Sequence, residues 1–356
     1  MTRKERFLMA LKVQRPDRVP LFDFLFQQPL YQELIGHRPE GYNGPDAVRC
    51  ALALDHDGVW LPFGGFTGYQ PTYLAKDVYQ DEWGTTYRKT EASWPIDAPI
   101  DYPIKSSADL KSYRPPDPSL PGRTAEIEAA RDMPNDDIAL LGGVQGPLTT
   151  AWLLMGYEGI CYALYDDPDL IDAVCRMSNE FFREAARRSA EAGCVGIWIS
   201  EDLGSSSGAF FSLEHYRRYF LAPFAELAEY VDSLGVPALL HACGHILPYL
   251  DDLCQTRIAA VHPLQRTAGM DLRQMKEKYG QRLCLIGNVD SSRTLPYGTP
   301  EEVAAEVREA IDIAAPGGGY VLASDHSLHD GIPVENILVM FRTAAEYGRA
   351  VYSRAG

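Results

Sequence analysis

The feature that most constrains the fold is a repeated alternation of short apolar runs with longer stretches of helical pattern. Eight apolar, β-branched runs occur along the chain, and each is continuous rather than alternating. Continuous runs are typical of strands buried on both faces, as in parallel sheets. The eight predicted strands cover residues 19–23, 58–63, 138–143, 195–200, 236–241, 258–263, 283–288 and 320–324.

The segments between these runs carry helix start signals. Pro168 suits the first turn of a helix over 167–192, and Ser212 is a suitable N-cap for a helix over 213–234. Thr299 and Glu302 have the spacing of a capping box. Eight strand–helix units predict an α/β fold, a single-domain (β/α)8 barrel of the TIM type.

One segment departs from the alternation. Residues 72–118 hold Trp83, Trp94, many tyrosines and several prolines. We interpret this segment as an insertion after the second strand that caps the barrel. Because (β/α)8 barrels reach this length as one domain, and because no linker is apparent, residues 1–356 are predicted to form one domain.

Composition excludes several classes of function. The net charge of −16 argues against nucleic acid or an anionic membrane surface as a partner, because phosphates require clustered Lys and Arg. No stretch reads as a membrane span or a signal peptide. The seven cysteines are scattered and form no CxxC pair, which favours a reduced, cytoplasmic setting over a disulfide framework.

In such barrels the chemistry lies at the carboxyl ends of the strands. His241 and Cys243 follow the fifth predicted strand, two positions apart, so their side chains point the same way. With a third ligand from His326 after the last strand, they would suit Zn²⁺. His245 and His329 compete for the third position, and the alternative is that Cys243 is only a small buried side chain.

Carboxylate and amide side chains are also predicted at the carboxyl ends of the strands. Glu201 and Asp202 follow the fourth strand, where either could act as a general acid or base, or could only complement a helix N-terminus. The other polar residues at strand ends are candidates for binding a small-molecule substrate: Asp23, Gln145, Asn288 and Asp290.

The strand-end segments resemble the uroporphyrinogen decarboxylase superfamily across essentially the whole chain. The matching segments include Pro16-Asp17-Arg18 near the start, His241-Ala242-Cys243-Gly244, and Gly287-Asn288-Val289-Asp290. The resemblance implies a single-domain (β/α)8 barrel. Some members of the superfamily are dimers, so a homodimer is an expectation here.

The decarboxylase branch of that superfamily holds its substrate's carboxylates with an Arg-Gln-Ala-Gly-Arg motif after the first strand. The corresponding stretch here is Phe24-Leu25-Phe26-Gln27-Gln28-Pro29, and no arginine follows until Arg38. A polyanionic substrate would therefore lack its charge-assisted partners.

The sequence is closer to the branch that resembles zinc-dependent methyltransferases. These move a methyl group between a corrinoid protein and a small substrate, here a thiol or a methyl ether or amine. Their His-x-Cys pattern is matched by His241 and Cys243, while His326 stands where the family has Cys. The chain has no DxHxxG pattern, so the corrinoid would arrive on a separate protein. Two alternatives stay open: a cofactor-free decarboxylase-like lyase and a non-catalytic barrel that binds a small ligand.

Overall fold

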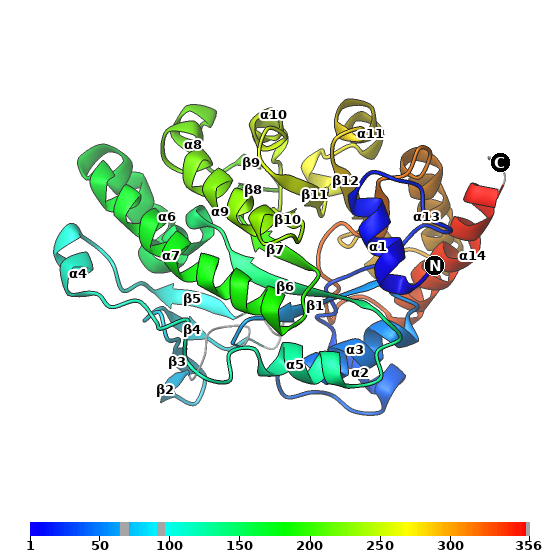
Figure 1. Ribbon diagram of the computed structural model, residues 1–356, viewed down its shortest axis with the longest axis horizontal. Helices are drawn as coiled ribbons and strands as arrows, with labels where there is room; N and C mark the ends of the chain where they lie inside the picture. Colours follow the sequence, from blue (N-terminus) through cyan, green and yellow to red (C-terminus); the bar gives the residue numbers. More distant parts are fainter. Residues whose placement is uncertain (65–70, 91–96, 354–356) are drawn as a thin grey trace.

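The computed structural model describes residues 1–64, 71–90 and 97–353, and its centre is a curled parallel sheet (Figure 1). Seven strands pair in the order β1-β6-β7-β10-β11-β12-β13, and every pairing in this sheet is parallel. The strands are β1 (Gly58–Pro62), β6 (Ala139–Gln145), β7 (Gly196–Ser200), β10 (Ala238–His241), β11 (Ile258–His262), β12 (Cys284–Val289) and β13 (Tyr320–Ser324). Seven of the eight predicted strands are thereby confirmed.

The eighth predicted strand, residues 19–23, is reduced to an isolated bridge between Leu21 and Leu322. Pro20 has no N–H, so it cannot donate to a ladder, and a regular strand does not form. Residues 19–23 still form backbone hydrogen bonds to the chain on both sides. Phe22 N donates to Leu322 O at 3.1 Å, and Asp57 N, directly before β1, donates to Leu21 O at 2.8 Å. The segment therefore lies between the first and last strands of the curled sheet.

A buried ion cluster fixes this junction. The Asp57 carboxylate, which is fully buried, accepts hydrogen bonds from Arg6 Nη1 at 2.6 Å, Arg18 Nη1 at 2.9 Å and Leu21 N at 2.9 Å. Arg6 is also paired with Asp17 at 2.5 Å. The early arginines of the sequence therefore hold the amino-terminal segment against β1.

Helices lie around the outside of the sheet (Figure 1). The predicted capping box of Thr299 and Glu302 is confirmed. The helix predicted over 213–234 is broken at Phe220, because Pro223 lacks an N–H and its ring clashes with the carbonyl of Tyr219. The helices are α1 (Arg3–Leu11), α2 (Gln28–Ile35), α3 (Gly44–Ala53), α4 (Ser107–Ser112), α5 (Ala125–Asp132), α6 (Pro147–Asp166), α7 (Pro168–Ala192), α8 (Leu213–Tyr219), α9 (Leu221–Ser233), α10 (Leu250–Leu253), α11 (Leu272–Tyr279), α12 (Thr294–Tyr297), α13 (Pro300–Ala314) and α14 (Val334–Ser353).

A small antiparallel sheet forms within residues 72–118 (Figure 1, lower left). Its strands are β2 (Thr72–Ala75), β3 (Val78–Gln80), β4 (Thr86–Arg88) and β5 (Ala98–Asp101). Its attachments to the rest of the protein include Arg123, which binds both carboxylate oxygens of Glu82 at 2.9 and 2.5 Å, and the hydroxyl of Thr85, which donates to Leu153 O at 2.6 Å. Residues 91–96, with Trp94, lie outside the described residues.

The core lies within the curled sheet and between the sheet and its helices. Strand β12 is buried at every position, as a continuous apolar run predicts. In the described part of the chain, no helix combines the length and the apolar character needed to cross a membrane.

Candidate metal and substrate site

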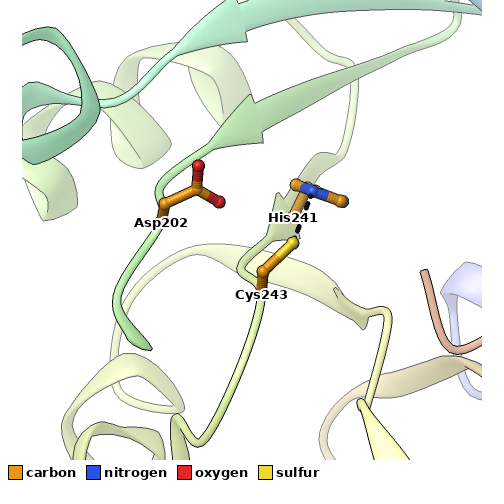
Figure 2. Close-up of side chains that lie close together, drawn as sticks. All are labelled: Asp202, His241 and Cys243. Atoms are coloured by element: carbon orange, nitrogen blue, oxygen red, sulfur yellow. Dashed lines mark hydrogen bonds between the residues drawn. The ribbon is translucent and has the colours of Figure 1, made fainter. Parts of the chain in front are cut away.

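Three potential metal ligands meet at the carboxyl ends of β7 and β10 (Figure 2). His241 is the last residue of β10, and Asp202 and Cys243 follow on the loops after β7 and β10. One ligand atom from each lies within 4.8 Å of the others. His241 Nε2 and Cys243 Sγ are 3.3 Å apart. We call these three residues the Asp–His–Cys cluster.

Strand pairing explains why the cluster forms. Strands β7 and β10 are neighbours, with Ser200 opposite His241, so the loops after both strands begin at the same edge. Gly244 shapes the second loop: its φ is +77°, and a Cβ there would lie 2.4 Å from the backbone carbon of Gly204. A side chain at position 244 would push apart the two loops that carry Asp202 and Cys243.

The cluster suits a zinc ion. Thiolate, imidazole and carboxylate are the ligands that Zn²⁺ uses in proteins. Ligand atoms on a tetrahedral Zn²⁺, with Zn–S of ~2.3 Å and Zn–N of ~2.0 Å, lie about 3.5 Å apart, close to the separation of His241 Nε2 and Cys243 Sγ. Asp202 Oδ1 is buried and has no hydrogen-bond partner among the described residues. That oxygen is therefore available to a ligand.

A second histidine orients the first. His241 Nδ1 lies 2.8 Å from His262 Nδ1. Burial lowers the pKa of His241 to about 3 and the pKa of His262 well below its usual value, so both rings are neutral at pH 7. One ring then donates its N–H and the other accepts it. Donation by His241 Nδ1 leaves its Nε2 lone pair facing Cys243, the arrangement that supports metal-binding histidines.

The cluster opens into a cavity of about 280 Å³. Its walls are mainly apolar and rich in aromatic side chains, and they come from the curled sheet, from α6 and α7, and from the small sheet. Asp202, His241 and Cys243 line one part of it, and Trp83 of the small sheet lines another. Trp83 lies nearly parallel to Phe182, with ring centroids 5.7 Å apart. The cavity therefore joins the Asp–His–Cys cluster to a largely apolar space.

Among the residues predicted for the site, Gln145 and His326 also line the cavity. His326 is half-buried, and burial lowers its pKa. It is not part of the cluster, whose third member is Asp202. The third ligand position predicted for His326 stays a prediction, and Asp202 is a further candidate for it.

Glu201 has a different position from its neighbour. Its carboxylate is fully buried and accepts hydrogen bonds from Leu148 N at 3.1 Å and Thr149 N at 3.0 Å, in the first turn of α6. A Cβ at Gly146 would lie 2.3 Å from Glu201 Oε2, so only glycine admits this contact. Burial raises the pKa of Glu201 to about 8. These contacts anchor a helix N-terminus, and Glu201 is not among the residues that line the cavity.

Three predicted substrate-binding residues make contacts within the fold. Asp23 accepts hydrogen bonds from the backbone and the hydroxyl of Ser324 at 2.8 and 2.9 Å, and burial raises its pKa to about 8. Asn288 donates to the carbonyls of Leu264 and Met270. Asp290 accepts from two backbone amides of the following turn. None of the three is among the cavity-lining residues.

The two competing histidines are occupied elsewhere. His245 Nδ1 lies 2.8 Å from Ala268 O. His329 Nε2 lies 3.3 Å from Ser291 O, and its Nδ1 accepts from Gly331 N at 3.1 Å. Neither lines the cavity with the cluster.

Sequence reasoning assigned no role to His262 or to the aromatic walls. His262 ends β11, next to β10, so its position at a strand end was a usable signal. Trp60 on β1 and Trp152 on α6 also line the cavity. No sequence signal distinguishes these tryptophans from ordinary core residues.

Comparison with known proteins agrees with this architecture. The family model described as uroporphyrinogen decarboxylase (URO-D) matches residues 94–347, more than half of the chain. The chain belongs to the URO-D family. It is 25% identical to the methylcobamide:CoM methyltransferase MtaA of Methanosarcina barkeri, over 97% of this chain and 98% of that protein. It is 24% identical to the uroporphyrinogen decarboxylase of Alkalilimnicola ehrlichii, over 94% and 91%.

A solved structure gives the fold of this URO-D family member independent support. The methyltransferase from Methanosarcina mazei superposes with a TM-score of 0.74, at 24% identity, and covers 98% of this chain and 99% of that one. Identity to the two classes of relative is nearly equal. The residues of the site must therefore decide between their activities.

Proposed function

We propose that the protein is a zinc-dependent methyltransferase that moves a methyl group between a small substrate and a corrinoid carried by a separate protein. The observation that carries the proposal is the Asp–His–Cys cluster at the wall of an apolar cavity. MtaA, which the chain resembles over nearly its whole length, is a methylcobamide:CoM methyltransferase by name, and this supports a corrinoid partner.

The residues would act as follows. His241, Cys243 and Asp202 would hold zinc, with His326 of the same cavity as an alternative or additional ligand. Bound zinc lowers the pKa of a thiol and polarises an ether oxygen. His262 holds the His241 ring in place at 2.8 Å. The aromatic walls exclude water from the reacting sulfur or oxygen, and Gln145 at the end of β6 can hydrogen-bond the substrate.

The cavity argues against the decarboxylase alternative. No Lys or Arg is among the cavity-lining residues in the described part of the chain, whereas Asp81, Glu82, Asp97 and Asp202 are. Substrate carboxylates would meet carboxylates of the protein rather than cations. A decarboxylase acting on a polycarboxylate needs the opposite charge pattern.

The arrangement of the chain supports two further proposals. Residues 1–356 form one (β/α)8 barrel, since residues 19–23 bond to both β13 and the residue before β1. Residues 72–118 are an insertion that caps the barrel, since Trp83 of the small sheet lines the same cavity as the cluster. The homodimer remains a prediction.

Methyl transfer tests the proposed function directly. Zinc-loaded protein is mixed with free methylcobalamin and 2-mercaptoethanol, and the cobalt spectrum is followed anaerobically. We expect demethylation of methylcobalamin with the wild type, and loss with Cys243→Ala. The matched control is Cys254→Ala, because Cys254 lies outside the cavity at a comparable depth. Equal rates for wild type and Cys243→Ala would refute the role of the cluster, and turnover of uroporphyrinogen would establish the lyase instead.

A further inference from the structure

We propose that the small substrate of this cavity is a cationic thiol or its methyl thioether, with an ammonium group held against the aromatic and acidic residues that line the same cavity as the Asp–His–Cys cluster. This inference rests on the proposed function, because it assigns the reacting sulfur to the cluster. It goes further by naming the charge that the rest of the substrate must carry.

Aromatic rings form a large part of the cavity wall. Trp83 and Phe182 lie nearly parallel, and Phe181 contacts Trp83 with centroids 4.7 Å apart. Trp60 and Trp152 line the same cavity. Indole faces attract ammonium groups, and tryptophan does so most strongly of the aromatic side chains.

Two carboxylates stand among these rings. Asp81 and Asp97, both of the small sheet region, line the cavity. Asp97 accepts hydrogen bonds from Tyr79 OH at 3.0 Å and from Thr90 N at 3.1 Å. Asp81 accepts from two backbone amides at 2.9 Å. A carboxylate has about four acceptor sites, so Asp97 retains capacity for an ammonium N–H or for attraction at contact distance. Burial raises the pKa of Asp81 to about 7, so Asp81 is only partly charged at neutral pH and Asp97 is the group to test.

Among the described residues that line the cavity, none is Lys or Arg. The nearby Arg123 is buried under Phe63 and Phe181, and its guanidinium is committed to Glu82. Residues 65–70 and 91–96, which the structure does not describe, contain no Lys or Arg. An anionic substrate would therefore enter without a cationic partner, whereas a cation finds aromatic faces and carboxylates.

The transfer step balances with this substrate. The thiol of the cationic substrate releases its proton to solvent. The sulfur electron pair forms the new S–CH₃ bond as the C–Co bond of the methylated corrinoid breaks. The bonding pair of that C–Co bond remains on cobalt, which passes from Co(III) to Co(I). The ammonium group is unchanged throughout, so it serves recognition alone.

Binding is measured first, without metal and without turnover. Tetramethylammonium chloride is titrated into the metal-free protein and tryptophan fluorescence is recorded, at ionic strength held constant with NaCl. We expect saturable quenching that sodium methanesulfonate does not produce. Asp97→Asn should weaken tetramethylammonium binding about 5- to 30-fold, the range that a charge or cation–π contact supports. Asp77→Asn, an exposed acid of the same small sheet, is the matched control and should leave it unchanged.

Turnover is then compared over four thiols of one chain length: thiocholine, 2-aminoethanethiol, 2-mercaptoethanol and 2-mercaptoethanesulfonate. An ammonium group also acidifies the thiol, so the decisive quantity is the ratio of kcat/KM for thiocholine to that for 2-mercaptoethanol, in wild type and in Asp97→Asn. We expect a fall of about 5-fold or more in the variant.

The outcomes separate the two claims. A preference for 2-mercaptoethanesulfonate, or no binding of tetramethylammonium, would overturn the cationic substrate while leaving methyl transfer intact. Binding of tetramethylammonium without methylation of any thiol would refute the proposed function, and with it the assignment of sulfur to the cluster.

Discussion

Replacing Arg123 by Met should weaken the attachment of the small sheet to the rest of the protein. The Arg123 side chain is 1% exposed and forms two parallel bonds to Glu82, at 2.9 and 2.5 Å. Its Nε donates to Asp117 O at 2.8 Å, and its guanidinium lies 5.6 Å from the Phe63 ring centroid. Met fills a similar volume but supplies none of the charge.

The expected loss of stability follows from the position of Glu82, which stays in place when Arg123 is replaced. The Glu82 side chain is only 13% exposed, so removal of Arg123 takes two charge-assisted hydrogen bonds from a largely buried carboxylate. Breaking a buried pair in this way costs about 3–5 kcal/mol of the free energy of unfolding. Replacing both partners by apolar groups of similar shape is often close to neutral. The double variant Arg123→Met with Glu82→Leu should therefore recover most of the loss.

The wild type, Arg123→Met, Glu82→Leu and the double variant form a complete double-mutant cycle. The unfolding of each in urea is followed by far-UV circular dichroism and by tryptophan fluorescence. The cycle should give a coupling free energy of about 2 kcal/mol or more between the two sites. A loss below about 1 kcal/mol for Arg123→Met, or a double variant less stable than the single, would refute the reasoning. Such a result would mean that the pair does not hold the small sheet in place.

Two further predictions concern buried carboxylates. Asp57→Asn should lower the free energy of unfolding by about 3 kcal/mol, measured by urea denaturation, because Arg6 and Arg18 lose a fully buried partner. The control Asp55→Asn, at a side chain that is 35% exposed, should lower it by less than about 1 kcal/mol in the same assay. Burial raises the pKa of Asp81 to about 7, so between pH 4 and pH 7 the folded state keeps a proton that the unfolded state has released. The free energy of unfolding of the wild type, measured in urea, should therefore fall relative to that of Asp81→Asn as the pH rises through this window. A difference between the two proteins that does not change with pH would contradict this prediction.

The parallel sheet could be predicted because its strands are buried on both faces. Such strands require continuous apolar runs, and seven of these runs correspond to the strands of the curled sheet. The segment at 19–23 has the same composition but contains Pro20, and its irregular hydrogen bonding depends on Asp57 and Leu322 from distant parts of the chain. Sequence pattern alone does not report such contacts.

For the candidate site, too, one part could be predicted from the sequence and another part could not. His241 and Cys243 could be placed together because strand geometry sets their spacing. Glu201 and Asp202 could not be told apart from the sequence. Glu201 accepts hydrogen bonds from the first turn of α6, whereas Asp202 belongs to the Asp–His–Cys cluster. Asp202 comes within 4.8 Å of His241 and Cys243 because β7 pairs with β10, and no local sequence signal ranked Asp202 against His326 as a third ligand.

The zinc content of the protein tests the central claim most directly. The protein is purified without chelator, and its metal is measured by plasma mass spectrometry in the wild type, Cys243→Ala, Asp202→Asn, His326→Ala and the control Cys254→Ala. The account predicts about one zinc per chain, lost in Cys243→Ala, reduced in Asp202→Asn and retained in Cys254→Ala. The His326→Ala result decides whether that residue is a further ligand. Absence of zinc from the wild type even after supplementation, or full retention in Cys243→Ala, would contradict the account.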